Sequence, residues 1–438
     1  MFKTLRNALR VKDIRQRILY VLLMLVVIRF GSQLPAPGVD SEYFQYWFST
    51  QSGDAFNFLD AFTGGSFAQM SIFALSITPY ITSSIIVQLL TIAIPKLEEI
   101  QRDGEQGKKK IAALTRYVTV GLALFESTAM AIGFGNQGLI PEMNFWKVVV
   151  VVATLTAGSA FLMWIGEQIN ENGIGNGISV VLFINIVSRI PSDISTLFEQ
   201  FVKGKTLAYQ VLAIVIIAAV ILVCVVFVLI LNGSERRIPV QYSKKMQGRK
   251  MVGGQSSHIP LKVNTAGVIP VIFASTIMSM PSLIMTFMGK TGGDGFWSKF
   301  FAAWNSGNWF NLEHPIYTWG LLLYIAMLIF FAYFYTSITF NPLEVADNMK
   351  KQGGFIPGIR PGKPTVDYLN NMLNYIIFIG AAGLTIVAVI PFFFNGVFGA
   401  SVSFGGTSII IIASVVLETL KQVESMMLVR NYKGFLND

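Results

Sequence analysis

Charged residues are scarce in this sequence. Asp, Glu, Lys and Arg make up 13% of the 438 residues, about half of the ~25% that is usual in soluble globular domains. That is too little charge to cover a water-facing surface. Hydrophobic residues reach 53%, and 35 residues are Phe, a composition that disordered, coiled-coil and collagen-like chains do not have. An integral membrane protein is the class that remains.

Cysteine and histidine are also nearly absent. Cys224 is the single cysteine and lies within an apolar run, so an internal disulfide and a cysteine-based metal site are both excluded. His258 and His314 fall in loops that we predict on opposite sides of the membrane, and they cannot share a metal ion. No Ser-His-Asp or paired-carboxylate arrangement stands out. We expect no metal, no cofactor and no enzymatic activity.

Long apolar runs are what the sequence has in quantity. A membrane-spanning helix needs about 20 mostly apolar residues, and ten runs approach or exceed this length. They predict an all-α integral membrane protein with ten transmembrane helices. The predicted spans are Ile18–Leu34, Met70–Ile94, Ile111–Gly133, Trp146–Ile165, Ile174–Ile190, Leu207–Leu231, Val263–Met288, Ile316–Phe340, Met372–Phe394 and Ser403–Leu420.

The connections between these spans alternate between rich and poor in positive charge. Of the 33 Lys and Arg residues, 26 fall in the loops, termini and adjoining span ends of one side and 6 in those of the other, while Arg29, within the first span, is counted with neither. Because cytoplasmic loops retain Lys and Arg, both termini are predicted to be cytoplasmic. The same rule accounts for the net charge of +9.

Ten spans divide into two halves of five. Because five is odd, the two halves are inverted relative to each other in the membrane. We predict an N-terminal half at residues 1–190, an external hinge at residues 191–206 and a C-terminal half at residues 207–438. In proteins built from inverted halves, the pathway often lies at the interface between them.

A polar stretch broken by glycine precedes the second span. Residues 55–67, which include Asp60, Gly64 and Gly65, are too polar to cross the membrane and too apolar for an exposed loop. Non-helical backbone is tolerated at membrane depth only where protein or a water-filled cavity surrounds it. The stretch therefore predicts a re-entrant helical segment in the mouth of a central pore. The alternative is an amphipathic helix at the outer interface.

Two predicted cytoplasmic loops are too long to be simple connectors. Residues 232–262 carry a basic strip that includes Arg249 and Lys250, and residues 341–371 carry Arg360 among Pro and Gly residues that fix turns. An arginine at such a tip offers a planar donor fork to a carboxylate or phosphate. We interpret these loops as docking sites for a large cytosolic partner. The alternative is a charge cluster that only sets the orientation.

Ionisable residues inside the spans are rare. Arg29 lies near one end of the first span, and Glu126 lies midway along the third. We expect the Arg29 side chain to extend outward to the interface, and Glu126 to serve either structural pairing or function. A proton- or ion-coupled transporter usually carries buried acids, His or Arg along its route, so this interior fits such a transporter poorly.

The second span carries an aliphatic stripe. Ile77, Ile81 and Ile85 step by four residues and share one helix face, a pattern that core or lipid contacts also produce. Polar side chains in the second and seventh spans are suited to line a seam between two helices. These are Thr78, Thr82, Ser83 and Gln88 in the second span, and Asn264, Thr265, Ser275 and Thr276 in the seventh.

Five stretches of the chain occur in the same order in a known family. They are Phe73-Ala-Leu-Ser-Ile-Thr-Pro-Tyr-Ile81, Gly173-Ile-Gly-Asn-Gly-Ile-Ser179, Gln255-Ser-Ser-His-Ile-Pro-Leu-Lys-Val-Asn-Thr-Ala-Gly-Val-Ile-Pro270, Gly354-Phe-Ile-Pro-Gly-Ile-Arg-Pro-Gly362 and Gly405-Gly-Thr-Ser408. Through them the chain resembles, over essentially its whole length, the bacterial SecY family, whose members are the main subunit of the protein-conducting channel.

The resemblance implies an hourglass channel that passes unfolded secretory polypeptides outward and releases hydrophobic segments sideways into the lipid. Residues 55–67 would be its plug, with Phe62, Thr63, Gly64 and Gly65 at the centre. The second and seventh spans would form a lateral gate that contains Gln88, Asn264 and Thr276. A ring of aliphatic side chains would form the constriction, and its members would be Ile77, Ile81, Ile178, Leu182, Ile272 and Ile411, with Leu182 in place of the isoleucine more usual in the family.

The resemblance also implies partners and a location. Arg249, Lys250 and Arg360 would contact the motor ATPase SecA and the ribosome, which supply the energy. SecE and SecG would be companion subunits, and secretory preproteins with signal sequences would be the substrates. The location would be the bacterial cytoplasmic (inner) membrane, whose lipids receive the released segments.

Two other interpretations compete with the channel. A secondary solute transporter also has inverted halves and broken segments, but it requires a polar midplane site and a coupling residue, for which Glu126 is the one candidate. A passive membrane scaffold would leave the plug-like segment and the two long basic loops without a purpose.

Overall fold

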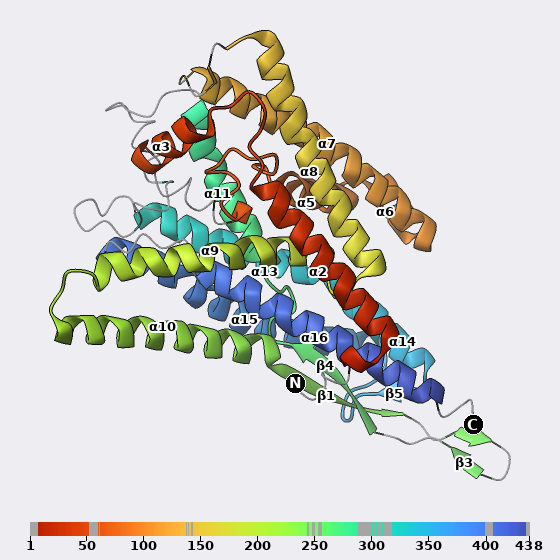
Figure 1. Ribbon diagram of the computed structural model, residues 1–438. Coiled ribbons are helices and arrows are strands. Elements are labelled where there is room, and N and C mark those ends of the chain that lie inside the picture. The colour runs from red at the N-terminus through yellow and green to blue at the C-terminus, as the bar shows by residue number, and fades with distance from the viewer. Residues whose placement is uncertain are drawn as a thin grey trace.

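The protein is a bundle of long helices with a small β-sheet at one end (Figure 1). The computed structural model describes residues 8–51, 60, 62–136, 138, 140–141, 143–242, 245–247, 250–252, 256–287, 300, 304, 309, 318–398 and 406–434.

Each of the ten predicted spans coincides with a helix among the described residues. By length and composition alone, six described helices are able to cross a membrane, or seven if α5 and α6 form one bent span. The other predicted spans fall on α2, α11 and α16. The ten helices are α2 (Lys12–Ser32), α5 (Thr78–Ala93), α7 (Gly104–Asn136), α8 (Phe145–Asn172), α9 (Gly177–Phe201), α10 (Leu207–Gly233), α11 (Ile269–Phe287), α13 (Thr318–Thr339), α15 (Lys363–Phe398) and α16 (Gly406–Gly434).

The outward surface of the bundle is apolar. Val26 on α2 is 68% exposed, Leu222 on α10 is 64% exposed and Ile386 on α15 is 56% exposed. A continuous apolar surface of this kind marks contact with a membrane. The fold and its surface therefore agree on a multi-pass membrane protein.

The helices pack as two groups of five. Helices α2, α5, α7, α8 and α9 contact one another, and α10, α11, α13, α15 and α16 do the same. The groups meet in two main places, where α9 packs against α16 and where α11 packs against α7 and α5. We call these contacts the α9–α16 seam and the α11 seam.

The second span begins later than its sequence predicts. The apolar run starts at Met70, but α5 starts at Thr78, where Pro79 occupies the first turn with its preset helical φ. The preceding backbone pairs with another segment, since Pro35 and Ser71 form an isolated β-bridge. At its other end α5 is bent by 108° from the short helix α6 (Pro95–Arg102).

The connection between the halves is shorter than predicted. Helix α9 continues through Pro191 to Phe201, so only residues 202–206 separate it from α10. Proline removes one hydrogen-bond donor and can bend a helix without ending it. Most of the segment predicted as a hinge is therefore helical.

The cytoplasmic loops predicted at residues 232–262 and 341–371 meet in a three-stranded antiparallel sheet. Its order is β4 (Ser256–Lys262), β1 (Glu235–Tyr242) and β5 (Gly354–Phe355). Strands β2 (Lys245–Gln247) and β3 (Lys250–Val252) form a separate hairpin. Helix α14 (Pro342–Lys351) packs beside β5.

The described ends of the chain lie beside this sheet, and α3 (Ser41–Gln51) lies at the far end of the bundle (Figure 1). Ile14 of α2 and Val423 of α16 pack with Ile174 in one small apolar cluster. Both ends of the chain thus share one side with the two long loops, as the charge pattern predicts.

Candidate functional site at the interface of the two halves

The six residues predicted as a ring lie on the helices that join the halves. Ile77 is the N-cap residue of α5 and Ile81 follows one turn later, while Ile178 and Leu182 occupy the first turns of α9. Ile272 and Ile411 come from α11 and α16 of the other half. The ring residues thus belong to the four helices α5, α9, α11 and α16.

All six side chains belong to one continuous apolar cluster. Ile77, Leu182, Ile272 and Ile411 are buried, with exposed fractions of 0%, 4%, 8% and 1%, and Ile81 and Ile178 pack against them half-buried. The cluster is much larger than the ring and continues through both halves. Aliphatic contact therefore closes the space between α5, α9, α11 and α16.

The hydroxyls of α5 are bonded within their own helix. Thr82 Oγ1 donates to Thr78 O at 3.1 Å, and Ser83 Oγ donates to Pro79 O at 2.6 Å. Such bonds to the preceding turn satisfy a hydroxyl where no water is present. The polar residues of α5 therefore leave the apolar character of the ring intact.

The segment predicted as a plug is attached to α9. Asn185 Nδ2 donates to Phe62 O at 3.2 Å and to Ser76 Oγ at 3.1 Å, and so connects the segment and the backbone just before α5 to α9. Ser188 Oγ donates to Gly64 O at 3.4 Å. Residues 52–59 and 61 lie outside the described residues, so these contacts concern the part from Asp60 onward.

Two glycines allow the segment to turn against α9. Gly64 and Gly65 have φ values of +70° and +87°, which side chains with a Cβ rarely adopt. A Cβ at Gly64 would also lie 2.8 Å from Asn185 Cα, whereas at Gly65 the nearest atom, Arg189 Cδ, is 4.0 Å away. The segment approaches α9 most closely at Gly64.

A buried ion pair closes this segment. Asp60 is fully buried, and its Oδ2 accepts a hydrogen bond from Arg189 Nη1. Asp60 Oδ1 accepts from Ala68 N at 2.8 Å, and Thr63 Oγ1 donates to Asp60 O at 3.2 Å. One carboxylate thus holds the turn of the segment and connects it to α9.

Arg29 points to this segment and not to the interface. Its Nη1 donates to Gly64 O at 3.1 Å, so the expectation that Arg29 extends outward is wrong. An acceptor within reach makes this inward orientation favourable at membrane depth, and Gly64 O accepts from both Arg29 and Ser188. Helix α2 therefore contributes a second contact to the segment.

Sequence reasoning missed the roles of Asn185, Ser188 and Arg189. The signal that could have found them is spacing, because Asn185 and Arg189 continue at three- and four-residue steps the face that begins with Ile178 and Leu182. Arg189 was instead counted among the charges of the outer loops.

Asn264, predicted in the lateral gate, is bonded within the second half. Its Nδ2 donates to Asn232 Oδ1 at 2.7 Å, and Asn232 Nδ2 donates to Ser414 Oγ on α16 at 2.8 Å. These two hydrogen bonds connect Asn264, which precedes α11, to the end of α10, and the end of α10 to α16. Asn264 therefore has its described hydrogen bond within its own half and not across the α11 seam.

The other two gate residues have bonds along their own helices. Gln88 Nε2 donates to Ser84 Oγ at 3.4 Å, and Thr276 Oγ1 donates to Ile272 O at 2.8 Å. Both side chains are half-buried. Their positions on α5 and α11 agree with a seam between these helices.

The loop that follows β5 of the three-stranded sheet presents Arg360 on a tight turn. Gly358 and Gly362, on either side, have φ values of +84° and +107°, and Thr365 Oγ1 donates to Arg360 O at 2.9 Å. The Arg360 side chain is exposed. Lys250 lies in β3, and Arg249 falls outside the described residues.

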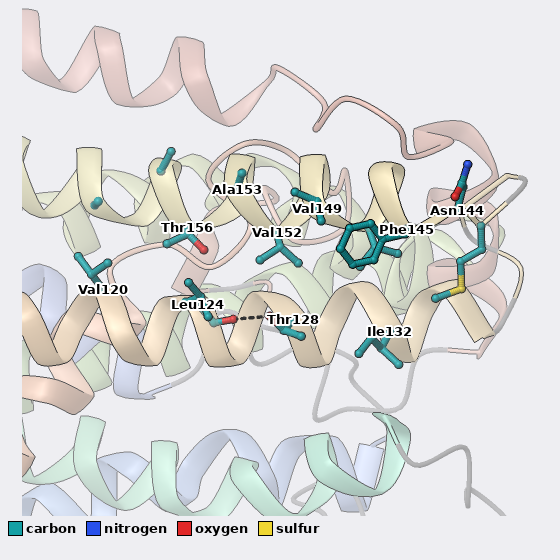
Figure 2. Close-up of a pocket in the computed structure, with 14 residues that line it drawn as sticks. Val120, Leu124, Thr128, Ile132, Asn144, Phe145, Val149, Val152, Ala153 and Thr156 are labelled. Atoms are coloured by element: carbon teal, nitrogen blue, oxygen red, sulfur yellow. Dashed lines mark hydrogen bonds between the residues drawn. The ribbon is translucent and has the colours of Figure 1, made fainter.

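Neither Glu126 nor a groove on the first half forms a polar solute site. Glu126 Oε1 is buried on α7 and accepts no hydrogen bond from the described residues. The groove, of about 950 Å³, lies between α7 and α8 on the outside of the bundle and is lined mostly by aliphatic side chains such as Leu124 and Val152 (Figure 2). Thr128, in the same lining, donates to Leu124 O. Within the described residues, no group of three His, Cys, Asp or Glu side chains could hold a metal ion.

A helical membrane bundle of two halves, with an aliphatic cluster and a re-entrant segment between them, defines the class of gated membrane channels. The sequence pattern of the SecY family matches residues 71–420. The chain is 43% identical to the protein translocase subunit SecY of Streptomyces galbus and 42% identical to that of Bacillus subtilis, with all of each chain covered. The chain belongs to the SecY family.

Solved structures show the same fold at low sequence identity. A protein-conducting channel aligns with a TM-score of 0.67 at 17% identity, over 94% of this chain and 92% of that one. A SecY translocation channel studied for its plug domain aligns at 0.62 and 17% identity, with the same coverage. Sec61 in the canine ribosome-channel complex aligns at 0.59 and 16% identity, again over 94% and 92%.

Proposed function

We propose that this chain forms the channel of a protein translocase, through which unfolded secretory polypeptides cross the membrane and from which hydrophobic segments enter the lipid sideways. The observation that supports this function is that the six aliphatic side chains assigned to the ring belong to one apolar cluster, on the four helices at the two seams between the halves. Family membership supplies the cargo, since the relatives are translocase subunits.

The ring explains how one constriction both seals and opens. A narrow aliphatic constriction excludes water and ions without any charged group. It also yields to a bulky chain, because apolar contacts are non-directional and no hydrogen bond must break. Ile77, Ile81, Ile178, Leu182, Ile272 and Ile411 are the residues assigned to this role.

The plug and the gate act on either side of this ring. Phe62, Thr63, Gly64 and Gly65 close the pore at rest, and the α11 seam, with Gln88, Asn264 and Thr276 along it, opens toward lipid. The halves, at residues 1–190 and 207–438, move apart around the connection between them. A hydrophobic signal helix opens the seam by binding the open state more tightly than the closed one.

The cytoplasmic face receives the partners that drive transport. Arg249, Lys250 and Arg360 contact the ATPase SecA or the ribosome, and a ribosome complex is known for the canine Sec61 neighbour. This chain itself is no enzyme, because the partner supplies the energy. SecE and SecG complete the complex in the bacterial cytoplasmic membrane, with both termini of this chain in the cytoplasm.

A crosslinking experiment on the full chain tests the channel. Cys224→Ser removes the single thiol, Ile81→Cys places one in the ring, and a secretory polypeptide is arrested in transit by a folded domain. We expect a crosslink from position 81 that requires both the arrest and the signal sequence.

The matched control is Leu222→Cys on α10, which is 64% exposed on the lipid-facing surface. We expect it not to react with the arrested chain. If the polypeptide is engaged and position 222 reacts while position 81 does not, the pore assignment is wrong.

A further inference from the structure

We propose that Asp60 and Arg189 form a charged latch that positions the plug, with Asn185 as its uncharged support. These are positioning residues, since none of them belongs to the ring through which the polypeptide passes. The inference rests on the proposed function only in taking the segment after Asp60 as a plug.

The latch combines a charge pair with hydrogen bonds. Asp60 is 0% exposed and the Arg189 side chain 22% exposed, so the carboxylate depends on protein donors. Arg189 Nη1 and Ala68 N bind its two oxygens. The carboxylate thus fixes the fold of the segment and its place on α9 at the same time.

The hydrogen bonds described here between the segment and neighbouring helices come from one half of the molecule. Arg29 on α2 and Ser188 on α9 donate to Gly64 O, and Asn185 on α9 donates to Phe62 O. Parting the α11 seam leaves both helices in place. The plug therefore does not leave merely because the seam opens, and its release requires separation of Asp60 from Arg189.

A buried ion pair has an asymmetric effect when it is mutated. Loss of one partner leaves an uncompensated charge without water, which is strongly destabilising, while loss of both partners together is often close to neutral. If the pair is a latch, single variants must loosen the closed plug and the double neutral variant must restore much of its position.

Ser66 offers a direct readout of the plug position. It lies in the segment, is 1% exposed and differs from cysteine by one atom. The assay uses the full chain with Cys224→Ser and Ser66→Cys, in its native complex, in membrane vesicles whose medium reaches the outer face of the protein. A water-soluble maleimide then labels position 66 only when the segment moves away from α9.

We expect Arg189→Met to speed this labelling at least about ten-fold, because Asp60 is then buried without a counter-charge. Asp60→Asn keeps an acceptor for Ala68 N but leaves Arg189 without its counter-charge, and it should speed the labelling less. The double variant Asp60→Asn/Arg189→Met should return to within about three-fold of the parent.

The matched control is Arg116→Met, which removes an arginine from the more exposed pair with Glu167 and should leave labelling unchanged. The latch is overturned if Arg189→Met labels no faster than the parent, or if the double variant stays as fast as that single variant. Should Arg189→Met not accumulate, Asp60→Asn decides alone, and labelling at the parent rate overturns the latch. Labelling requires no polypeptide in transit, so failure of the channel function in the crosslinking experiment is distinguished from failure of the latch.

Discussion

One face of α9 carries both aliphatic and polar groups that bear on the pathway. Ile178 and Leu182, in its first two turns, belong to the apolar cluster of the ring, and Asn185 and Arg189 hold the plug segment further along. The polar groups are tolerated because each donates to an acceptor of that segment. The residues proposed for the ring and the contacts of the proposed plug are thus carried by one helix.

Gly64 and Gly65 provide a test of how closely the segment must approach this face. Alanine at either position meets the same left-handed strain of about 1–2 kcal/mol. Only Gly64→Ala also places a Cβ 2.8 Å from Asn185 Cα, which adds about 1–3 kcal/mol of overpacking. We therefore expect a resting ion leak several-fold larger in Gly64→Ala than in Gly65→Ala, measured as conductance of the full complex in planar bilayers. Equal leaks in the two variants would contradict a resting position of the segment that depends on its close contact with α9.

Helices were more predictable than their interruptions. The positions of the ten spans follow from apolar length, whereas the ring is an assignment from family motifs within them. The late start of α5 could not be predicted, because the preceding apolar stretch satisfies its backbone through Pro35 and Ser71, which are distant in sequence. Asp60 and Arg189 are 129 positions apart in the sequence. The pattern around either residue does not identify the other as its partner.

The three-stranded sheet holds the short turn around Arg360 in a fixed place. Strand β5 pairs with β1, and Ile356 packs into the apolar cluster beneath the sheet, which leaves Arg360 exposed at the tip. We expect Arg360→Glu to reduce the rate of translocation by about ten-fold, because reversing the charge at a proposed contact slows association with the cytosolic partner. The free energy of unfolding should stay within about 0.5 kcal/mol of the parent.

The control for this turn is Lys363→Glu, which changes the net charge by the same amount at an exposed position three residues later. It should lower the rate by less than about two-fold, since a carboxylate is tolerated at the start of α15. Rates are compared with purified partner and a defined preprotein in membrane vesicles. A similar loss in both variants would show that net charge, and not Arg360, governs the step.

The two seams between the halves are built differently. At the α9–α16 seam, Gly175 N donates to Gln422 Oε1 at 2.5 Å, and a backbone loop lies against Thr419. At the α11 seam, Ile81 of α5 and Ile272 of α11 share the apolar cluster of the ring. Directional bonds resist separation over a short distance, while apolar contacts allow sliding and parting. The α9–α16 seam is therefore suited to be the pivot, and the α11 seam the side that opens.

A disulfide across the α9–α16 seam tests this division of the molecule. A Cβ at Gly175 lies 3.8 Å from Thr419 Cβ, the separation that a disulfide prefers, so Gly175→Cys/Thr419→Cys in a Cys224→Ser background should oxidise readily. Because a pivot does not need to separate, we expect the oxidised complex to keep at least about half of the translocation rate of the same protein after reduction. The positive φ of 93° at Gly175 strains both redox forms equally, and reduction of the same sample is therefore the matched control. A block of translocation that reductant relieves would mean that α9 and α16 must part, and that the molecule opens on the side assigned here to the pivot.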